Sequence, residues 1–273
     1  MKKTTCIFML TMGYCLAVNL SNRALAQPTQ PSCGTIKILE PTTIDTRFFS
    51  SGSYQLNVNG TSCADVLGID GALGQILGTA PNAPLPTPWV SLFDAIGAPK
   101  FTAGSTIGIR LQKLQDLPAV RVLEEVVLSG ITTSNGSATS ASFAMSAAAV
   151  DSTITSQSFS NGDSIDIVSR ITPQIQDRGL PGDIYIVVRI IENGVIQFFS
   201  LNRIGQWEVW DGAEGTLKPA YTLAVLGTEH KISVYSGPLN AGDKAIYMGY
   251  SAINGNKRLI HYNGNPFIIS VGD

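Results

Sequence analysis

Short runs of alternating apolar and polar residues recur along the first half of this chain. They cover residues 35–39, 53–58, 105–111 and 119–128, and turn-forming residues such as glycine and proline close them. Successive side chains of a strand point to opposite faces, so a strand with one buried face shows this alternation. The pattern therefore predicts a β-rich first half, with the first two runs forming strands that a loop connects.

Other segments of the first half have weaker patterns. Apolar residues between 64 and 80 have partly helical spacing, but interspersed glycines disfavour a helix. The fold of residues 64–100 therefore stays open, with at most one short helix expected over 89–96, after a proline-rich stretch. Residues 132–149 are rich in Ser, Thr and Ala, which fits either edge strands or a linker.

The second half of the chain alternates more regularly. Runs rich in aromatic and β-branched residues cover 164–171, 183–191, 195–201, 206–210, 230–235, 245–252 and 266–271. Turn residues separate them, and Asn193 with Gly194 gives the strongest hairpin signal because both residues accept the positive φ of a type I′ turn. We therefore predict an all-β protein: an antiparallel β-sandwich domain over 156–273 follows a β-rich domain over 27–155 that has at most one or two short helices.

The first 26 residues have the features of a secretory signal peptide. Lys2 and Lys3 precede an apolar run over 6–20, and Ala24 and Ala26 form a small-residue cleavage site. The run is shorter than the roughly 20 residues that a spanning helix needs, so we expect cleavage and no membrane span. The predicted location is the periplasm, the extracellular medium or the cell surface.

The charge pattern limits the classes of partner. The formal net charge is −2, and charged residues make up 14% of the chain, against about 25% in ordinary domains. Lysines and arginines are scattered along the chain with no run longer than two, whereas nucleic-acid and anionic-membrane binders concentrate them in a patch or stripe. We therefore expect no nucleic-acid partner, and instead an envelope or extracellular protein or a glycan.

Two cysteines follow the predicted cleavage site. Cys33 and Cys63 both lie beside turn-forming residues, and an exported protein meets an oxidising compartment. Their spacing is not that of a redox-active C-x-x-C pair. We predict that they form a structural disulfide.

Part of the second half resembles a known kind of module. The residues concerned are Gly-Asp-Ser-Ile-Asp-Ile at 162–167, Gly-Leu-Pro-Gly-Asp-Ile-Tyr-Ile-Val at 179–187 and Tyr-Met-Gly-Tyr at 247–250. With these turns and core strands, residues 160–273 resemble a β-sandwich accessory module of secreted or surface proteins of Gram-negative bacteria. The resemblance implies an architecture and an extracytoplasmic setting, and it designates no catalytic position.

The polar residues do not form a recognisable catalytic or metal-binding motif. His230 and His261 lack metal-ligand spacing, so we expect a structural or surface role for each and no metal site. Glu124 and Glu125 are adjacent, and in a strand they would point to opposite faces. The pairs Asp163/Asp166 and Asp177/Asp183 are expected at turns. We predict no catalytic residue and no cofactor.

The aromatic residues are the best candidates for binding. In the run 206–210, alternation places Trp207 and Val209 on one face and Glu208 and Trp210 on the other, which can leave one tryptophan exposed. Exposed Trp and Tyr stack on sugars or anchor interfaces. Trp210 and Tyr250 are therefore the candidate binding residues, although a covered sheet edge or a small apolar cluster would explain the same pattern.

These observations favour an exported, non-enzymatic protein that binds a ligand or assembles at the cell envelope or surface. The competing hypothesis is a secreted or periplasmic hydrolase that uses carboxylates, as glycosidases do on β folds.

Overall fold

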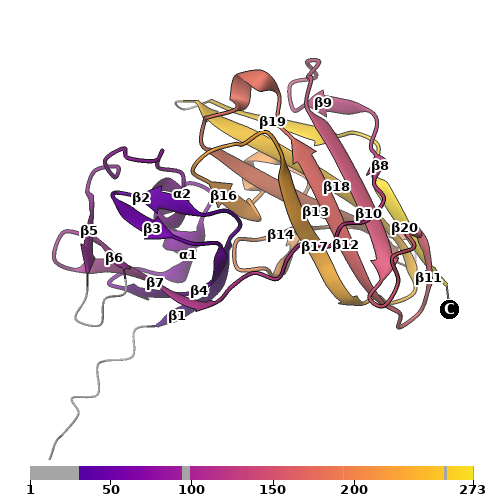
Figure 1. Ribbon diagram of the computed structural model, residues 1–273, viewed down its shortest axis with the longest axis horizontal. Helices are drawn as coiled ribbons and strands as arrows, with labels where there is room; N and C mark the ends of the chain where they lie inside the picture. The colour runs from indigo at the N-terminus through magenta and orange to yellow at the C-terminus, as the bar shows by residue number, and fades with distance from the viewer. Residues whose placement is uncertain (1–30, 94–98, 193, 255–256, 273) are drawn as a thin grey trace, which may run out of the picture.

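The computed structural model describes residues 31–93, 99–192, 194–254 and 257–272, and it shows a nearly all-β protein (Figure 1). The N-terminal part contains a five-stranded antiparallel sheet, and the C-terminal part contains a four-stranded and a nine-stranded sheet. Side chains of these two larger sheets share one core, as in a β-sandwich. The predicted fold class is confirmed, and the predicted signal peptide over 1–26 lies outside the described residues.

The N-terminal sheet brings the first two predicted strands together. Its order is β1 (Ser32–Ile38), β4 (Gly52–Asn59), β7 (Ile107–Gln115), β6 (Pro99–Ala103) and β5 (Trp89–Phe93). A small hairpin of β2 (Thr42–Ile44) and β3 (Arg47–Phe49) connects β1 to β4. Alternate side chains such as Leu56 and Ile109 are fully buried on one face, as the period of two predicts.

Two short helices complete the N-terminal core. They are α1 (Cys63–Leu67), whose N-cap Ser62 accepts a hydrogen bond from the amide of Asp65, and α2 (Ala72–Leu77). Their buried side chains pack in the same cluster as the sheet residues. The glycines between them explain the interrupted pattern, since a side chain at Gly71 would lie 2.5 Å from the carbonyl oxygen of Val66. No helix among the described residues is long and apolar enough to cross a membrane.

The prediction of a short helix over 89–96 is wrong. The first five of these residues form strand β5, which pairs with β6 in a hairpin. Aromatic and β-branched residues in Trp-Val-Ser-Leu-Phe favour a strand, and pairing with β6 satisfies the backbone groups that a helix would have bonded internally.

The four-stranded sheet has the order β17 (His230–Pro238), β12 (Ser164–Thr172), β10 (Ser142–Ala149) and β8 (Val126–Val127). At the start of the run at 132–149, the end of β9 (Ile131–Thr133) pairs only with β19 (Lys257–Asn263), and a connection follows. The expectation of edge strands or a linker therefore holds for the first part of this run but not for the second part. Its second part, β10, lies between two neighbours and is buried on both faces. Small residues such as Ala144 and Ala148 suit it to this crowded position.

The run at 119–128 is mostly not a strand. Only β8 pairs with a neighbour, and the residues before it pack Leu123 against Ala148 and Val168. Arg121 donates to Asp166 at 2.6 Å, and Glu125 forms an ion pair with Arg170 at 2.6 Å. Side-chain contacts therefore attach the residues before β8 to the sheet, and only β8 is attached by backbone pairing. The alternation of apolar and polar residues is the same in both cases, so it does not reveal which kind of attachment forms.

The nine-stranded sheet contains most of the strands predicted in the second half. Its main path is β11 (Ser158–Ser160), β20 (Phe267–Gly272), β18 (Gly242–Asn254), β13 (Gly182–Glu192), β14 (Val195–Leu201) and β15 (Trp207–Trp210). Three further strands attach to it: β9 (Ile131–Thr133), β16 (Tyr221–Leu223) and β19 (Lys257–Asn263). The predicted hairpin is β13–β14, with Gly194 at a positive φ of 78°, while Asn193 lies outside the described residues.

The strand pairing divides the chain earlier than the predicted boundary near 155. Strands β8, β9 and β10 precede residue 155 but pair within the two C-terminal sheets. The change from the N-terminal sheet to the sandwich falls between β7 and β8. The connection between β14 and β15 reaches back to the N-terminal part, where Ile204 packs in its core.

Candidate functional site

A groove rich in aromatic side chains lies on the outer face of the nine-stranded sheet, away from the sandwich core. It has a volume of about 530 Å³. We call it the aromatic groove. Its ring-bearing residues are Tyr185, Phe198, Trp210, Tyr247 and Tyr262.

Alternation along β13 explains why this outer face is apolar. Ile184 and Ile186 point into the sandwich core, whereas Tyr185 and Val187 point to the opposite side and are also buried. A strand buried on both faces is a near-continuous apolar run, and Ile-Tyr-Ile-Val at 184–187 has this form. These outward side chains belong to a second apolar cluster, which we call the outer cluster and which forms the floor of the aromatic groove. Its buried members are Tyr185, Val187, Leu217 and Ile260.

A glycine lies at the centre of this floor. Gly249 of β18 is paired with Tyr185 of β13 on one side and with Tyr262 of β19 on the other. A side chain at Gly249 would lie 2.8 Å from the carbonyl oxygen of His261 and 3.3 Å from Cβ of Tyr262. Close packing therefore requires glycine here, and Gly249 lines the groove between two tyrosines without a side chain of its own.

Trp210 forms the wall of the groove on the β15 side. Its ring meets the ring of Phe198 edge to face, with centroids 6.0 Å apart, a favoured aromatic geometry. Its indole N–H donates to the carbonyl of Ala213 at 3.0 Å. The indole is half-buried, so it retains an accessible surface toward the groove.

The loop after Trp210 is held against the groove by its own hydrogen bonds. Oδ1 of Asp211 accepts from the amide of Ala213 at 2.9 Å and from the hydroxyl of Thr216, and the Thr216 bond is the main cause that lowers the pKa of Asp211. The short 3₁₀ helix η2 (Glu214–Thr216) follows, and Leu217 then packs into the outer cluster. Glu214 therefore stands at the rim with an exposed side chain.

A buried polar group lies beneath the groove. The hydroxyl of Tyr185 is within 3.1 Å of Oγ of Ser251 and accepts from Arg258, whose guanidinium also lies 4.6 Å from the centre of the Tyr185 ring. Burial raises the pKa of Tyr185 far above its ordinary value. The phenol is therefore neutral at physiological pH and helps to fix the arginine.

The structure separates the two candidate binding residues. Trp210 lines the aromatic groove, whereas Tyr250 points inward and is fully buried. The hydroxyl of Tyr250 donates to Asp177 at 2.8 Å and accepts from the amide of Gln174 at 3.0 Å. Tyr250 therefore has a structural environment, and it shares no groove with Trp210.

His261 belongs to the same buried network as Tyr250. The two rings are stacked with centroids 4.8 Å apart and an interplanar angle of 6°. Nε2 of His261 lies 3.2 Å from Oδ2 of Asp177, and Nδ1 lies 2.7 Å from the hydroxyl of Thr139. This series of hydroxyl, imidazole and carboxylate resembles a catalytic triad, but the imidazole is covered by Tyr250 and only 3% exposed.

His230 is also buried, at the junction of the two parts of the chain. Its Nε2 accepts from the amide of Gly227 at 2.9 Å, which places the ring proton on Nδ1. Nδ1 then donates to Glu40 at 2.6 Å. The fully occupied ring has the structural role predicted for it.

Most acidic residues considered as catalytic candidates have structural partners. Asp166 accepts from Arg121 and Ser236, and Asp163 accepts from the amide of Ser160. The expectation that Asp183 lies at a turn is wrong, because it lies within β13 and faces Arg203. Across the described residues, no group of three or more His, Cys, Asp or Glu is placed to hold a metal ion.

The predicted disulfide between Cys33 and Cys63 is confirmed, with Cα atoms 5.3 Å apart. It joins the first residues of β1 to the start of α1. The bond therefore attaches the N-terminal strand to the helices of the N-terminal core. This strand belongs to the five-stranded sheet, whereas the aromatic groove lies on the nine-stranded sheet.

No family model, curated protein or solved structure matches this chain. Its function therefore has to be inferred from its own geometry. Sequence reasoning identified Trp210 among the groove residues and missed Tyr185, Tyr247 and Tyr262. The available signal was the doubly apolar run at 184–187, which indicates a second buried face.

Proposed function

We propose that this protein is an exported, non-enzymatic glycan-binding protein and that the aromatic groove is its binding surface. The observation that carries the proposal is the groove that Gly249 lines, surrounded by tyrosine and tryptophan rings on the outer face of the sheet. A concave site with mostly apolar walls and few polar groups is the usual form of a ligand site.

The composition of the groove favours a sugar as the ligand. A pyranose ring presents C–H groups on its faces and hydroxyl groups around its edge, so it stacks on an aromatic ring and forms hydrogen bonds sideways. Trp210 and Tyr262 offer half-buried rings, and Glu214 and Ser134 offer exposed polar side chains at the rim. These polar groups lie at the edge, where the hydroxyls of a stacked sugar would be.

Export is supported by two independent features. The first 26 residues have the pattern of a secretory signal peptide. The disulfide of Cys33 and Cys63 suits an oxidising compartment. Glycans are abundant in the periplasm, at cell surfaces and in the extracellular medium, so the proposed location and ligand are compatible.

Affinity electrophoresis of the mature protein through gels that contain different polysaccharides tests the proposal. We expect at least one polysaccharide to retard the protein, and Trp210→Ala to weaken that binding by about tenfold or more, since a central aromatic contact contributes roughly 1–2 kcal/mol. The matched control is Phe48→Ala, which removes an aromatic side chain that is 68% exposed on β3. This control should bind like the unmodified protein.

Two outcomes would contradict the proposal. One is that no polysaccharide in a broad panel, including peptidoglycan fragments, binds the protein. The other is that a polysaccharide binds but Trp210→Ala and Phe48→Ala both bind it with unchanged affinity. Circular dichroism of both variants separates a lost contact from a lost fold.

A further inference from the structure

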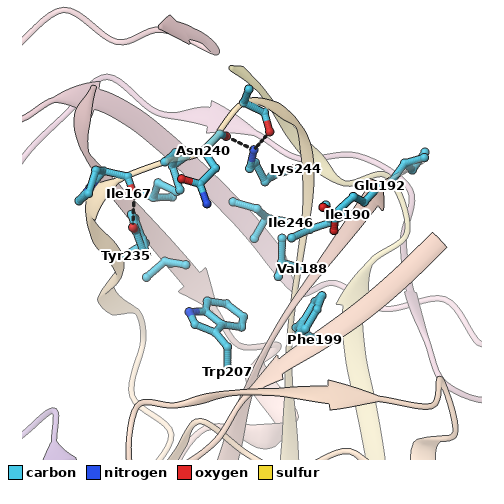
Figure 2. Close-up of a pocket in the computed structure, with 15 residues that line it drawn as sticks. Ile167, Val188, Ile190, Glu192, Phe199, Trp207, Tyr235, Asn240, Lys244 and Ile246 are labelled. Carbon is cyan, nitrogen blue, oxygen red and sulfur yellow. Dashed lines mark hydrogen bonds between the residues drawn. The ribbon is translucent and has the colours of Figure 1, made fainter. Parts of the chain in front are cut away.

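A second space lies inside the sandwich, between its two sheets at one end (Figure 2). We call it the intersheet cavity. It has a volume of about 420 Å³. Phe199, Trp207 and Ile246 come from the nine-stranded sheet, and Ile167 and Val234 come from the four-stranded sheet.

Strand alternation explains the apolar lining. Trp207 and Val209 share the inner face of β15, as the sequence predicts, and Trp207 faces the cavity while Trp210 faces the aromatic groove. Strands β14 and β15 form one border of the nine-stranded sheet, and Val209 on β15 is 78% exposed. The inner face near this border is therefore incompletely covered, which leaves the space open to solvent on one side.

One charged side chain belongs to this apolar space. Lys244 of β18 is only 8% exposed, and its ammonium donates to the carbonyls of Asn240, Ala241 and Gly242. In Figure 2, Lys244 and Asn240 lie at one end of the cavity, and Trp207 and Phe199 lie at the other. The cavity therefore has a cationic end and an aromatic end.

The positive charge of Lys244 has no direct ionic partner. The three carbonyls satisfy its donors but carry no net charge, and among the ion pairs of the described residues none includes Lys244. Its neighbour Asp243 is exposed, and alternation directs it to the opposite face of β18, so its attraction offsets only part of the effect of burial, which lowers the pKa of Lys244. Glu192 lines the rim but is exposed to solvent. Burial of a charge is costly without an opposite charge, so the site favours an anion beside Lys244.

We propose that the intersheet cavity binds a long-chain fatty carboxylate, with its chain along the apolar walls and its carboxylate at the Lys244 end. Each methylene that leaves water stabilises the complex by about 0.8 kcal/mol, which the apolar walls can supply. The three donors of the ammonium are occupied by carbonyls, so Lys244 acts on the head group through its positive charge, which favours an anionic over a neutral head group. This site is separate from the aromatic groove, and the inference does not depend on glycan binding.

Tryptophan quenching locates the chain. The protein contains three tryptophans, so the double variant Trp89→Phe/Trp210→Phe retains Trp207 alone. A fatty acid with a bromine at the end of its chain should quench the fluorescence of Trp207 in a saturable way. The matched variant Trp89→Phe/Trp207→Phe retains Trp210, on the opposite face of the sheet, and its fluorescence should be unaffected at the same concentrations.

A second experiment tests the role of the charge. The unmodified protein should bind the fatty carboxylate at least about fivefold more tightly than the alcohol of equal chain length, as expected for a carboxylate placed beside one positive charge. Lys244→Met should remove this preference while it retains alcohol binding. The control Lys231→Met changes an exposed lysine of β17 and should keep the preference. Val188→Phe, which fills the cavity, should weaken both ligands.

The proposal is overturned if the brominated chain does not quench Trp207, or if it quenches Trp207 and Trp210 equally, which indicates adsorption to the surface. It is also overturned if the unmodified protein binds carboxylate and alcohol with equal affinity. Trp210→Ala should bind the fatty acid normally, so failure of glycan binding and failure of fatty-acid binding are distinguishable.

Discussion

Burial determines what individual side chains of this protein can do. His261 has the neighbours of a catalytic histidine, yet it is stacked under Tyr250 and shielded from solvent. Burial lowers the pKa of His261, and the carboxylate of Asp177 opposes this effect only in part. The imidazole is therefore held in its neutral form and contributes to the fold through its hydrogen bonds.

We expect the His261 network to make the protein less stable at mildly acidic pH. The folded-state pKa of His261 lies below that of an exposed histidine, so the unfolded chain takes up the proton first as the pH falls. Its contribution to stability is present above about pH 6.5 and is lost as the pH falls through the folded-state pKa. Urea unfolding between about pH 7.5 and 5 should show a larger loss in the unmodified protein than in His261→Gln.

Titration of the ring by NMR checks the same prediction directly. His261 should titrate below about pH 6.5, the ordinary value for histidine. Since the chain has two histidines, His230→Gln leaves a single imidazole signal to follow. A titration midpoint above the ordinary value would contradict the prediction.

At the scale of elements, the neighbouring strands decide whether a segment becomes part of a sheet. The valine-rich run at 119–128 has the higher strand propensity, yet the alanine-rich run at 142–149 becomes the central strand. Pairing with β12 over its whole length selects β10. In the first run only β8 joins the ladder, and the residues before it are bound through the side chains of Arg121 and Glu125.

The disulfide is the covalent connection between elements of the N-terminal part. Cys33 and Cys63 are 30 residues apart in sequence, and closure of a loop of this length stabilises a fold by roughly 3–4 kcal/mol through the unfolded chain. We expect Cys33→Ala/Cys63→Ala to lower the free energy of unfolding by about this amount in urea. A reducing agent should destabilise the unmodified protein and leave the double variant unchanged, and equal stability of the two oxidised proteins would contradict the prediction.

At the scale of the whole molecule, one arginine connects the two parts. Arg203, in the β14–β15 connection, donates to the carbonyl of Gly68 at 2.8 Å and to the hydroxyl of Thr222 at 3.0 Å. Its guanidinium also lies 3.5 Å from Asp183, and burial lowers the pKa of Arg203 despite this carboxylate. A hairpin end of the sandwich is thus fixed between the two helices of the N-terminal part.

Gly74 of α2 makes room for this arginine, and its substitution tests the junction. A Cβ at Gly74 would lie 2.5 Å from Nη2 of Arg203, whose hydrogen bonds prevent an easy shift. Gly→Ala inside a helix normally stabilises by up to about 1 kcal/mol. We expect Gly74→Ala instead to destabilise by about 1–3 kcal/mol, as overpacking does.

Gly215→Ala is the matched control for the junction. A Cβ at Gly215 meets no atom within 4 Å, so this variant should unfold at the same urea concentration as the unmodified protein or a higher one. If Gly74→Ala is equally stable, Arg203 is not packed as the structure shows. Both variants replace glycine with alanine, but only Gly74 lies against Arg203. A difference in stability between them therefore reports the contact with the arginine.

The sequence alone determined the features that depend on neighbouring residues. The strands of the second half, the β13–β14 hairpin and the opposite faces of Trp207 and Trp210 follow from alternation and turn chemistry, which act over a few residues. The disulfide could also be predicted, because only two cysteines follow the predicted cleavage site. The resemblance to a bacterial surface module stays a prediction.

Only the tertiary structure decided which residues meet across the sheets. Tyr185, Gly249 and Tyr262 form one row because three strands from different parts of the chain pair side by side. The burial of Tyr250, the placement of Lys244 in an apolar cavity and the contact of Arg203 with Gly74 have the same origin. Alternation specifies the face of a side chain within its own strand, but strand order and register specify its neighbours, and these depend on contacts between residues far apart in sequence.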